Sequence, residues 1–113
     1  MKKEHQFIAR LEECMREQIY LNPRLTLQEL ALRVGTNRTY LSRYINREKK
    51  QTFFDYLNTY RLGYAVELLT HTNLTLEVIA ERSGFNSLST FRRFFQQTYG
   101  TSPSAYKKEH TAN

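Results

Sequence analysis

The sequence predicts an all-α fold of about seven helices, in which a long helix joins two helix-turn-helix subdomains. One stretch of the 113-residue chain occurs twice, as residues 25–45 and 74–94, and each copy has the pattern of two short helices around a glycine turn. Outside the repeat, apolar residues recur at three- and four-residue steps, which is typical of helices that bury one face. No segment alternates apolar and polar residues as a half-buried strand does.

The two copies match at an offset of 49 residues, and they share the residues that such a unit needs. Each has an alanine where the two helices cross and, four residues later, a glycine for the turn. A helix-turn-helix presents its second helix to a groove of DNA, so the repeat predicts two such helices on one scaffold. The identical pairs include Leu25/Leu74, Thr26/Thr75, Leu27/Leu76, Ala31/Ala80, Arg33/Arg82, Gly35/Gly84 and Asn37/Asn86.

The first subdomain is expected within residues 4–50. An amphipathic N-terminal helix ends before Pro23, because the residue that precedes a proline disfavours helical geometry. Thr26 and Glu29 then form a capping box, and Asn37 caps the second helix of the unit. The expected helices cover about 4–20, 27–34 and 38–46.

A spacer helix is expected over residues 52–70, opened by a cap of Thr52 with Asp55. Its apolar residues suggest one buried stripe. Gly63 lies inside this helix, where glycine costs about 1 kcal/mol relative to alanine, and it is either a hinge or an exposed position with little influence. The stripe consists of Phe53, Leu57, Tyr60, Tyr64 and Leu68.

The second subdomain is expected within residues 74–108. Thr75 caps its first helix, Ser87 or Asn86 caps its second, and Gly100 ends that second helix. A final short helical turn begins at Ser102, with proline at its first position. The two longer helices cover about 76–83 and 87–98.

The second helix of each unit has one apolar side and one polar side. The apolar residues of the second unit come one position later than the offset of 49 requires, so its turn is expected to be one residue longer. The inward residues are Leu41, Tyr44 and Ile45 in the first unit and Phe91, Phe94 and Phe95 in the second. At an offset of 50, the outward residues pair as Thr39/Ser89, Ser42/Arg92, Arg43/Arg93 and Asn46/Gln96.

These outward residues are of types that suit the major groove of DNA. Arginine can donate two hydrogen bonds to guanine, and hydroxyl groups can meet phosphates or base edges. We favour DNA contacts for Arg43 and Arg93, whereas solvation of the helix face is an equal alternative for Asn46 and Gln96. Asn37 and Asn86 are interpreted as caps rather than base readers.

The charge of the chain favours an anionic partner. Lysine and arginine exceed aspartate and glutamate by 17 to 11, and the surplus follows the second helix of each repeat. Lysines beyond these helices carry no base information and are interpreted as phosphate contacts. The chain has no apolar run that could span a membrane, no signal peptide and a single cysteine, Cys14, which together favour a cytoplasmic setting.

The second half of the chain carries a set of spaced landmarks, which are Ile79, Ala80, Gly84, Phe85, Phe91, Arg93, Phe95, Gly100, Pro103 and Tyr106. The spacer helix adds Tyr60-Arg61-Leu62 with Ala65, Leu68 and Leu69. In these residues the chain resembles the DNA-binding domain of the AraC/XylS family of bacterial transcription regulators. The resemblance covers about residues 7–107, so that residues 1–113 are interpreted as one AraC-type domain.

The resemblance implies sequence-specific binding of double-stranded DNA, with the two second helices in successive major-groove segments. It also implies transcription regulation, commonly activation through contact with RNA polymerase, and an effector or dimerisation domain elsewhere in a longer protein. Carried over by position, the candidates for base contacts are Arg38, Thr39, Ser42, Arg43, Leu88, Ser89 and Arg93. The candidates for phosphate contacts are Asn46, Lys49, Lys50, Arg92, Gln96, Lys107 and Lys108. Two residues depart from the family pattern: Thr39 replaces a large aromatic of some relatives, and Lys107 replaces an arginine.

Other functional classes fit the residues less well. The histidines, His5, His71 and His110, are scattered and lack a cysteine or carboxylate at ligand or triad spacing, so we expect neither an enzyme nor a metal or cofactor site. A protein-interaction module is disfavoured by the outward arginines. A non-specific architectural DNA binder remains a third alternative, and it would bind all duplexes with similar affinity.

Overall fold

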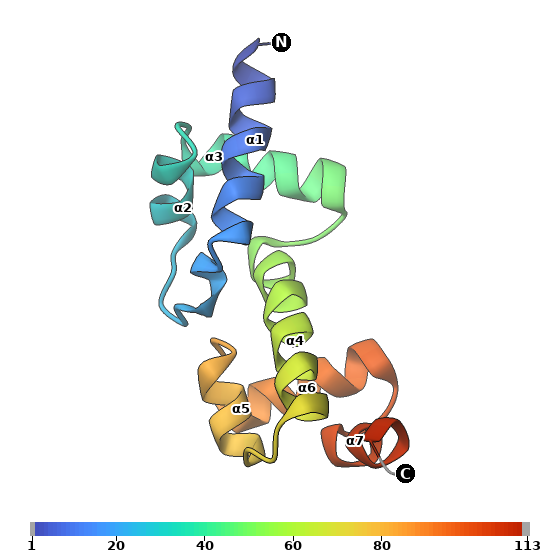
Figure 1. The fold of residues 1–113 in the computed structure, drawn as a ribbon. Coiled ribbons are helices and arrows are strands. Elements are labelled where there is room, and N and C mark those ends of the chain that lie inside the picture. Colours follow the sequence, from blue (N-terminus) through green and yellow to red (C-terminus); the bar gives the residue numbers. More distant parts are fainter. Residues whose placement is uncertain (1, 112–113) are drawn as a thin grey trace. The chain divides into compact units, whose positions relative to one another are not determined.

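The computed structural model describes residues 2–111, with side chains from Glu4 to His110, and its regular structure within that range is entirely helical. The predicted all-α fold is therefore confirmed (Figure 1). In chain order the elements are α1 (Lys2–Arg16), the 3-10 turn η1 (Ile19–Leu21), α2 (Leu27–Arg33), α3 (Arg38–Tyr44), the π-helical η2 (Ile45–Lys49), α4 (Phe53–His71), α5 (Leu76–Arg82), α6 (Leu88–Tyr99) and α7 (Pro103–Thr111).

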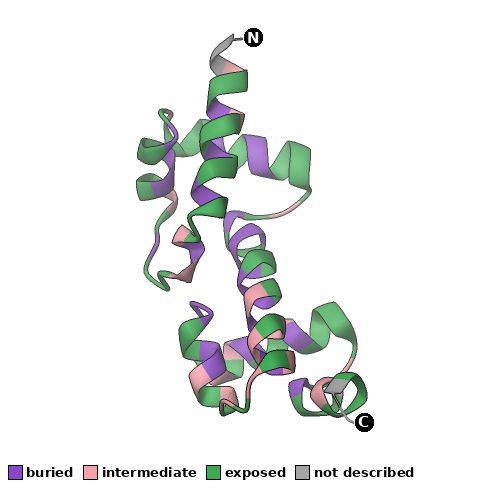
Figure 2. Cartoon of the chain, viewed as in Figure 1, coloured by how far each residue is buried: buried purple, intermediate pink, exposed green. Residues whose placement is uncertain are grey.

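The chain divides after Leu57 into two compact units, and each is described by itself. The first unit holds α1 to η2 and the first turn of α4. The second unit holds the rest of α4 and α5 to α7. Figure 2 shows that most helices carry buried residues on one side and exposed residues on the other, which is the pattern expected of helices around a core.

The core of the first unit forms where α1 crosses α3 (Figure 1). The ring of Phe7 meets Tyr44 edge-on with centroids 4.9 Å apart, and it meets Tyr40 in the same way at 5.3 Å. Edge-to-face pairs of this kind add to the gain from apolar burial. The residues of this unit with no exposed surface are Leu30, Ala31, Leu41, Ile45 and Leu57.

The core of the second unit is a cluster of phenylalanine rings packed on α4. Phe91 lies between Phe85 and Phe95, with ring centroids 5.3 and 5.8 Å away. These rings pack with Leu62, Ala65 and Leu69 of α4 and with Ile79 and Ala80 of α5. Close packing of large rings explains why α6 holds a fixed orientation on the unit.

The N-terminal helix ends earlier than predicted. An α-helix over 4–20 was expected, but α1 stops at Arg16 and Gln18 adopts a left-handed conformation with φ of 61°. The chain resumes as η1, which places Tyr20 in a buried position. Apolar spacing alone did not reveal this break, because Ile19 continues the three- and four-residue steps of the apolar residues before it.

The second helix of the first unit also differs at its end. The prediction of α-helix to residue 46 is wrong, because α-helical geometry stops at Tyr44 and the chain continues as η2. The wider turns keep Ile45 fully buried, and Lys50 ends the segment in a left-handed conformation. Local sequence carries little signal for such a π-helical insertion.

The predicted apolar stripe of α4 is correct in part, at its start and at Leu68, which packs half-buried against the second core. Phe53 and Leu57 are buried, whereas Tyr60 is 39% exposed. In the second unit the side of α4 that packs on the phenylalanine cluster carries Leu62, Ala65 and Leu69 instead. The helix is apolar on more than one side, so periodicity could not decide which side each unit buries.

Most of the helix starts occur where the sequence placed them. Thr26 and Glu29 form the expected capping box, and the Oγ1 atom of Thr75 accepts the Val78 amide at 3.2 Å. The Oγ1 atom of Thr52 accepts the Asp55 amide at 3.1 Å. The last helix, α7, is longer than the short turn expected there.

Candidate nucleic-acid interface

Each helix-turn-helix contains a glycine in the left-handed region. Gly35 has φ of +82° and Gly84 has φ of +89°, values that glycine adopts at no steric cost. At Gly35 a Cβ atom would also lie 2.5 Å from a guanidinium nitrogen of Arg10, which reaches over from α1. The Arg10 side chain is exposed and can move, so it is the positive φ of Gly35 that favours glycine at this turn.

The second turn is one residue longer than the first, as predicted. Four residues separate α2 from α3, and five separate α5 from α6. Asn37 caps α3 by accepting the Tyr40 amide at 2.9 Å, and Ser87 caps α6 by accepting the Thr90 amide at 3.1 Å. The interpretation of Asn86 as a cap is wrong, because the extra residue moves the capping position to Ser87.

The inward sides of the two second helices lie as predicted. Leu41, Ile45, Phe91 and Phe95 have no exposed surface, and Tyr44 is buried. Phe94 is half-buried against the second core. Because one side of each helix is fixed in its own core, the opposite side is held outward.

The outward side of α3 brings four polar residues together. Arg38, Thr39, Ser42 and Arg43 are exposed. Ser42, Arg43 and Asn46 line an open cavity of about 470 Å³ together with Arg47, which the sequence analysis did not select. Arg47 follows Arg43 by four residues, and this helical spacing could have indicated that both lie on the same side of the helix.

Arg47 differs from its neighbours because two carboxylates hold it. Its Nε atom lies 2.9 Å from Glu48, and its Nη2 atom lies 3.5 Å from Glu4 of α1. The hydrogen bond that Arg47 donates to the Glu48 carboxylate raises the pKa of Arg47, so the guanidinium stays charged. Exposed ion pairs of this kind exchange readily for other anions, since each contributes little free energy.

The outward side of α6 has the same character. Ser89, Arg92, Arg93 and Gln96 are exposed, and Leu88 is half-buried against the second core. The guanidinium carbon of Arg93 lies 5.8 Å from the ring centre of Phe94, within the range of a cation–π contact. This contact leaves the arginine on the outward side.

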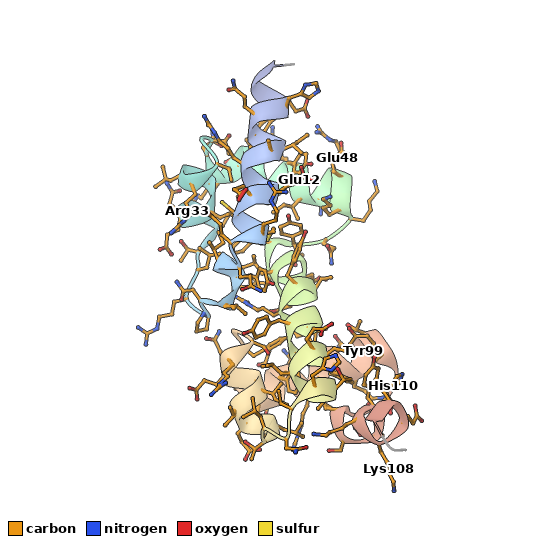
Figure 3. All side chains as sticks on the ribbon, in the orientation of Figure 1. Glu12, Arg33, Glu48, Tyr99, Lys108 and His110 are labelled. Carbon is orange, nitrogen blue, oxygen red and sulfur yellow. The ribbon has the colours of Figure 1, made fainter. Side chains whose placement is uncertain are left out.

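The predicted phosphate-binding lysines fall into two groups. Lys49, Lys50 and Lys108 are exposed, and Lys108 projects away from α7 (Figure 3). Lys107 is half-buried, and its Nζ atom donates a hydrogen bond to the carbonyl of Thr72 at 2.8 Å. Lys107 thus has a partner inside its own unit.

The described part of the chain was also considered for metal-binding clusters and membrane-spanning helices. Between residues 2 and 111, no three or more histidine, cysteine, aspartate or glutamate side chains gather as metal ligands would. Within the same residues, none of the helices combines the length and the apolar character that crossing a bilayer requires.

Comparisons with known proteins agree with this geometry. A family model described as a helix-turn-helix domain matches residues 30–109. The regulatory protein PocR of Salmonella typhimurium is 31% identical over 94 residues, which is 83% of this chain and 31% of PocR. The transcriptional activator NphR of a Rhodococcus species is 34% identical over 86 residues, which is 76% of this chain and 25% of NphR. The chain thus spans about a third or less of these relatives.

A solved structure supports the same assignment. The DNA-binding domain of the global transcriptional factor AdpA, solved in complex with a target DNA, superposes with a TM-score of 0.80 at 25% identity. The match covers 91% of this chain and 94% of that domain. Together with the family match, these likenesses show that the chain belongs to the AraC-type helix-turn-helix family.

Proposed function

We propose that this chain binds double-stranded DNA in a sequence-specific manner and that α3 and α6 are its recognition helices. One observation carries the proposal. On both helices the side opposite the core presents an exposed hydroxyl and an exposed arginine four residues later, Thr39 with Arg43 and Ser89 with Arg93. This pairing is what an α-helix needs to lie in the major groove and read guanine.

The exposed residues divide into base readers and phosphate contacts. Phosphate contacts fix the position of a recognition helix, and base contacts select the sequence. The proposed base readers are Arg38, Thr39, Ser42, Arg43, Leu88, Ser89 and Arg93. The proposed phosphate contacts are Asn46, Lys49, Lys50, Arg92, Gln96 and Lys108, with Lys107 as a weaker candidate because Thr72 holds its ammonium.

The two recognition helices enter successive major-groove segments of one duplex in this proposal. The likeness to the AdpA domain, which was solved on its target DNA, supports it. The chain is then one part of a transcription regulator that acts on DNA in the bacterial cytoplasm. The relative NphR is named an activator, which favours activation, with RNA polymerase as the partner and an effector or dimerisation domain in the remainder of a longer protein.

Selection of binding sites from random duplexes tests the proposal. We expect a preferred sequence that spans two successive helical turns. Arg93→Ala is expected to lower affinity for that site about 10- to 100-fold, because a bidentate arginine–guanine contact discriminates by about 1–3 kcal/mol. Its affinity for random DNA should change far less.

Lys108→Ala is the matched control, because a phosphate contact weakens binding to all duplexes about equally. A selection that returns no preferred sequence would favour a non-specific DNA binder. In that case Arg93→Ala and Lys108→Ala would lower affinity for every duplex alike.

A further inference from the structure

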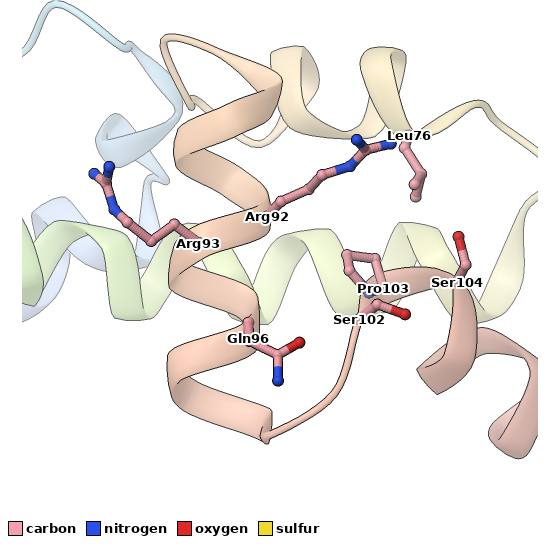
Figure 4. Close-up of a pocket in the computed structure, with 7 residues that line it drawn as sticks. All are labelled: Leu76, Arg92, Arg93, Gln96, Ser102, Pro103 and Ser104. Carbon is pink, nitrogen blue, oxygen red and sulfur yellow. The ribbon is translucent and has the colours of Figure 1, made fainter.

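A cavity lies beside the recognition helix of the second unit, where three helices meet. It has a volume of about 460 Å³ and forms between the start of α5, the middle of α6 and the start of α7 (Figure 4). Two arginines and a glutamine come from α6, and two serines come from the start of α7. The residues that line it are Leu76, Arg92, Arg93, Gln96, Ser102, Pro103 and Ser104.

The lining has the chemistry of an anion site. It offers guanidinium, amide and hydroxyl groups, and none of its residues is acidic. In Figure 4 the side chain of Arg92 extends from α6 toward Leu76, and the hydroxyl of Ser104 projects toward the same space. The guanidinium of Arg93 points the other way, so Arg93 contributes only its stem. Arginine with neighbouring hydroxyl and amide donors is a frequent arrangement around phosphate oxygens.

We propose that this cavity seats one backbone phosphate of the DNA that α6 reads, held by Arg92, Gln96 and Ser104. The inference rests on the proposed function. Arg92 and Arg93 are adjacent on α6, and their guanidinium groups point in opposite directions (Figure 4). Arg92 can therefore hold a phosphate in the cavity while Arg93 contacts a base in the major groove. Ser104 of α7 is then a positioning residue that fixes the register of Arg93, although it touches no base.

Ser102 and Ser104 differ in their hydrogen bonds to the backbone of α7. The Oγ atom of Ser102 accepts the Ala105 amide at 3.1 Å, so its removal would also disturb the start of α7. Ser104 is exposed. Lys107, the basic residue one turn further along α7, is held by Thr72. Ser104 is therefore the residue through which the cavity can be changed with least damage to the fold.

The first experiment places a negative charge in the cavity. Ser104→Asp is expected to lower affinity for cognate and random duplexes alike, by about tenfold or more, because the new carboxylate repels the phosphate at short range. Asn73→Asp adds the same charge at another exposed position of the second unit and should change affinity less than about twofold. Circular dichroism confirms that both variants are folded. Equal affinities for the two variants would overturn the proposal.

The second experiment removes charge from the DNA. Duplexes carrying a neutral methylphosphonate at one backbone position at a time should reveal a single phosphate whose loss weakens the wild type several-fold but weakens Ser104→Ala much less. The converse result, with full losses in both proteins at every position, would contradict the cavity as the seat of that phosphate.

These outcomes separate the cavity from the proposed function. A wild type without sequence preference, combined with a selective loss in Ser104→Asp, would refute sequence reading and keep the phosphate seat. A free phosphate site predicts something else: saturable shifts of the Ser104 amide resonance with millimolar inorganic phosphate, and DNA affinity insensitive to Ser104→Asp. That pair of results would overturn the proposal.

Discussion

Lys107 and Thr72 link the last helix to the end of α4 through a hydrogen bond of 2.8 Å between the lysine Nζ atom and the threonine carbonyl. The carbonyl belongs to the residue just after α4, where helix carbonyls lack partners within the helix. A cation at this place also interacts favourably with the C-terminal end of the helix dipole. The second unit thus uses Lys107 to fasten α7 to α4.

Lys107→Met is therefore expected to lower the free energy of unfolding by about 1.5–3 kcal/mol, the usual range for a hydrogen bond that involves a charged group. Urea denaturation followed by circular dichroism measures this, which suits a chain without tryptophan. The salt dependence of DNA binding should match that of the wild type. A shallower salt slope at unchanged stability would instead identify Lys107 as a phosphate contact.

Ser83 is the next informative position, because its hydroxyl is fully buried and has no hydrogen-bond partner. Ser83→Ala removes an unsatisfied polar group and is expected to raise the free energy of unfolding by up to about 1 kcal/mol. The equivalent residue of the first unit is Val34, which is 1% exposed. Val34→Thr should lower the free energy of unfolding by about 1–3 kcal/mol, because it places a buried hydroxyl without a hydrogen-bond partner in the first unit. A stability loss in Ser83→Ala would show that the hydroxyl has a partner in solution.

Because the second turn is one residue longer, Ser87 and not Asn86 caps α6. Ser87→Ala should cost about 1 kcal/mol, because it leaves the Thr90 amide without its acceptor. Asn86→Ala, the neighbouring control, should change stability by less than about 0.5 kcal/mol. Hydrogen exchange of the first amides of α6 provides a local measurement. Equal protection in both variants would mean that Ser87 does not hold the start of the helix.

Gly63 allows a stability gain. It lies inside α4, it is exposed, and a Cβ atom there would meet no atom within 4 Å. Gly63→Ala is expected to stabilise the chain by about 1 kcal/mol in urea denaturation, with unchanged DNA affinity. If stability rises while affinity falls, the alternative of a hinge at Gly63 is correct.

Alkaline pH should weaken the first unit through Cys14. Burial raises the pKa of this thiol, and Arg33 opposes the effect only in part. The folded state therefore keeps the proton to higher pH than the unfolded chain, so this contribution is complete below the unfolded pKa and is lost as pH rises through the folded pKa. The free energy of unfolding should therefore fall as pH rises above about 8.5, the ordinary pKa of a cysteine thiol. The same burial predicts slow thiol alkylation in native protein and fast alkylation in urea; equal rates would contradict it.

Most of the fold could be predicted from the sequence, because helix caps and turn glycines depend on residues close to them in the chain. The capping box at Thr26 and the turn at Gly35 need only neighbouring residues, and both are found as predicted. The end of α1 and the π-helical η2 depend on which residues tertiary packing buries, so periodicity missed them. The buried side of α4 was missed for the same reason.

The candidate interface was predictable to a similar extent. The outward positions of Arg43 and Arg93 follow from helix geometry once Leu41 and Phe91 are set inward. Ser104 was not selected, because its neighbours in the cavity come from α5 and α6, far away in the sequence. Contacts between helices that are distant in the sequence cannot be predicted from local sequence patterns.

The extra residue between α5 and α6 has a practical consequence for engineering. Up to the turn glycines, matched residues of the two units differ by 49 in number, and from the caps onward they differ by 50. A chimaera that transfers the proposed DNA-reading residues of α3 onto α6 must therefore place Thr39 at position 89 and Ser42 at position 92. A graft made at the shorter spacing would rotate every transplanted side chain by about 100° around the helix axis, away from its original outward direction.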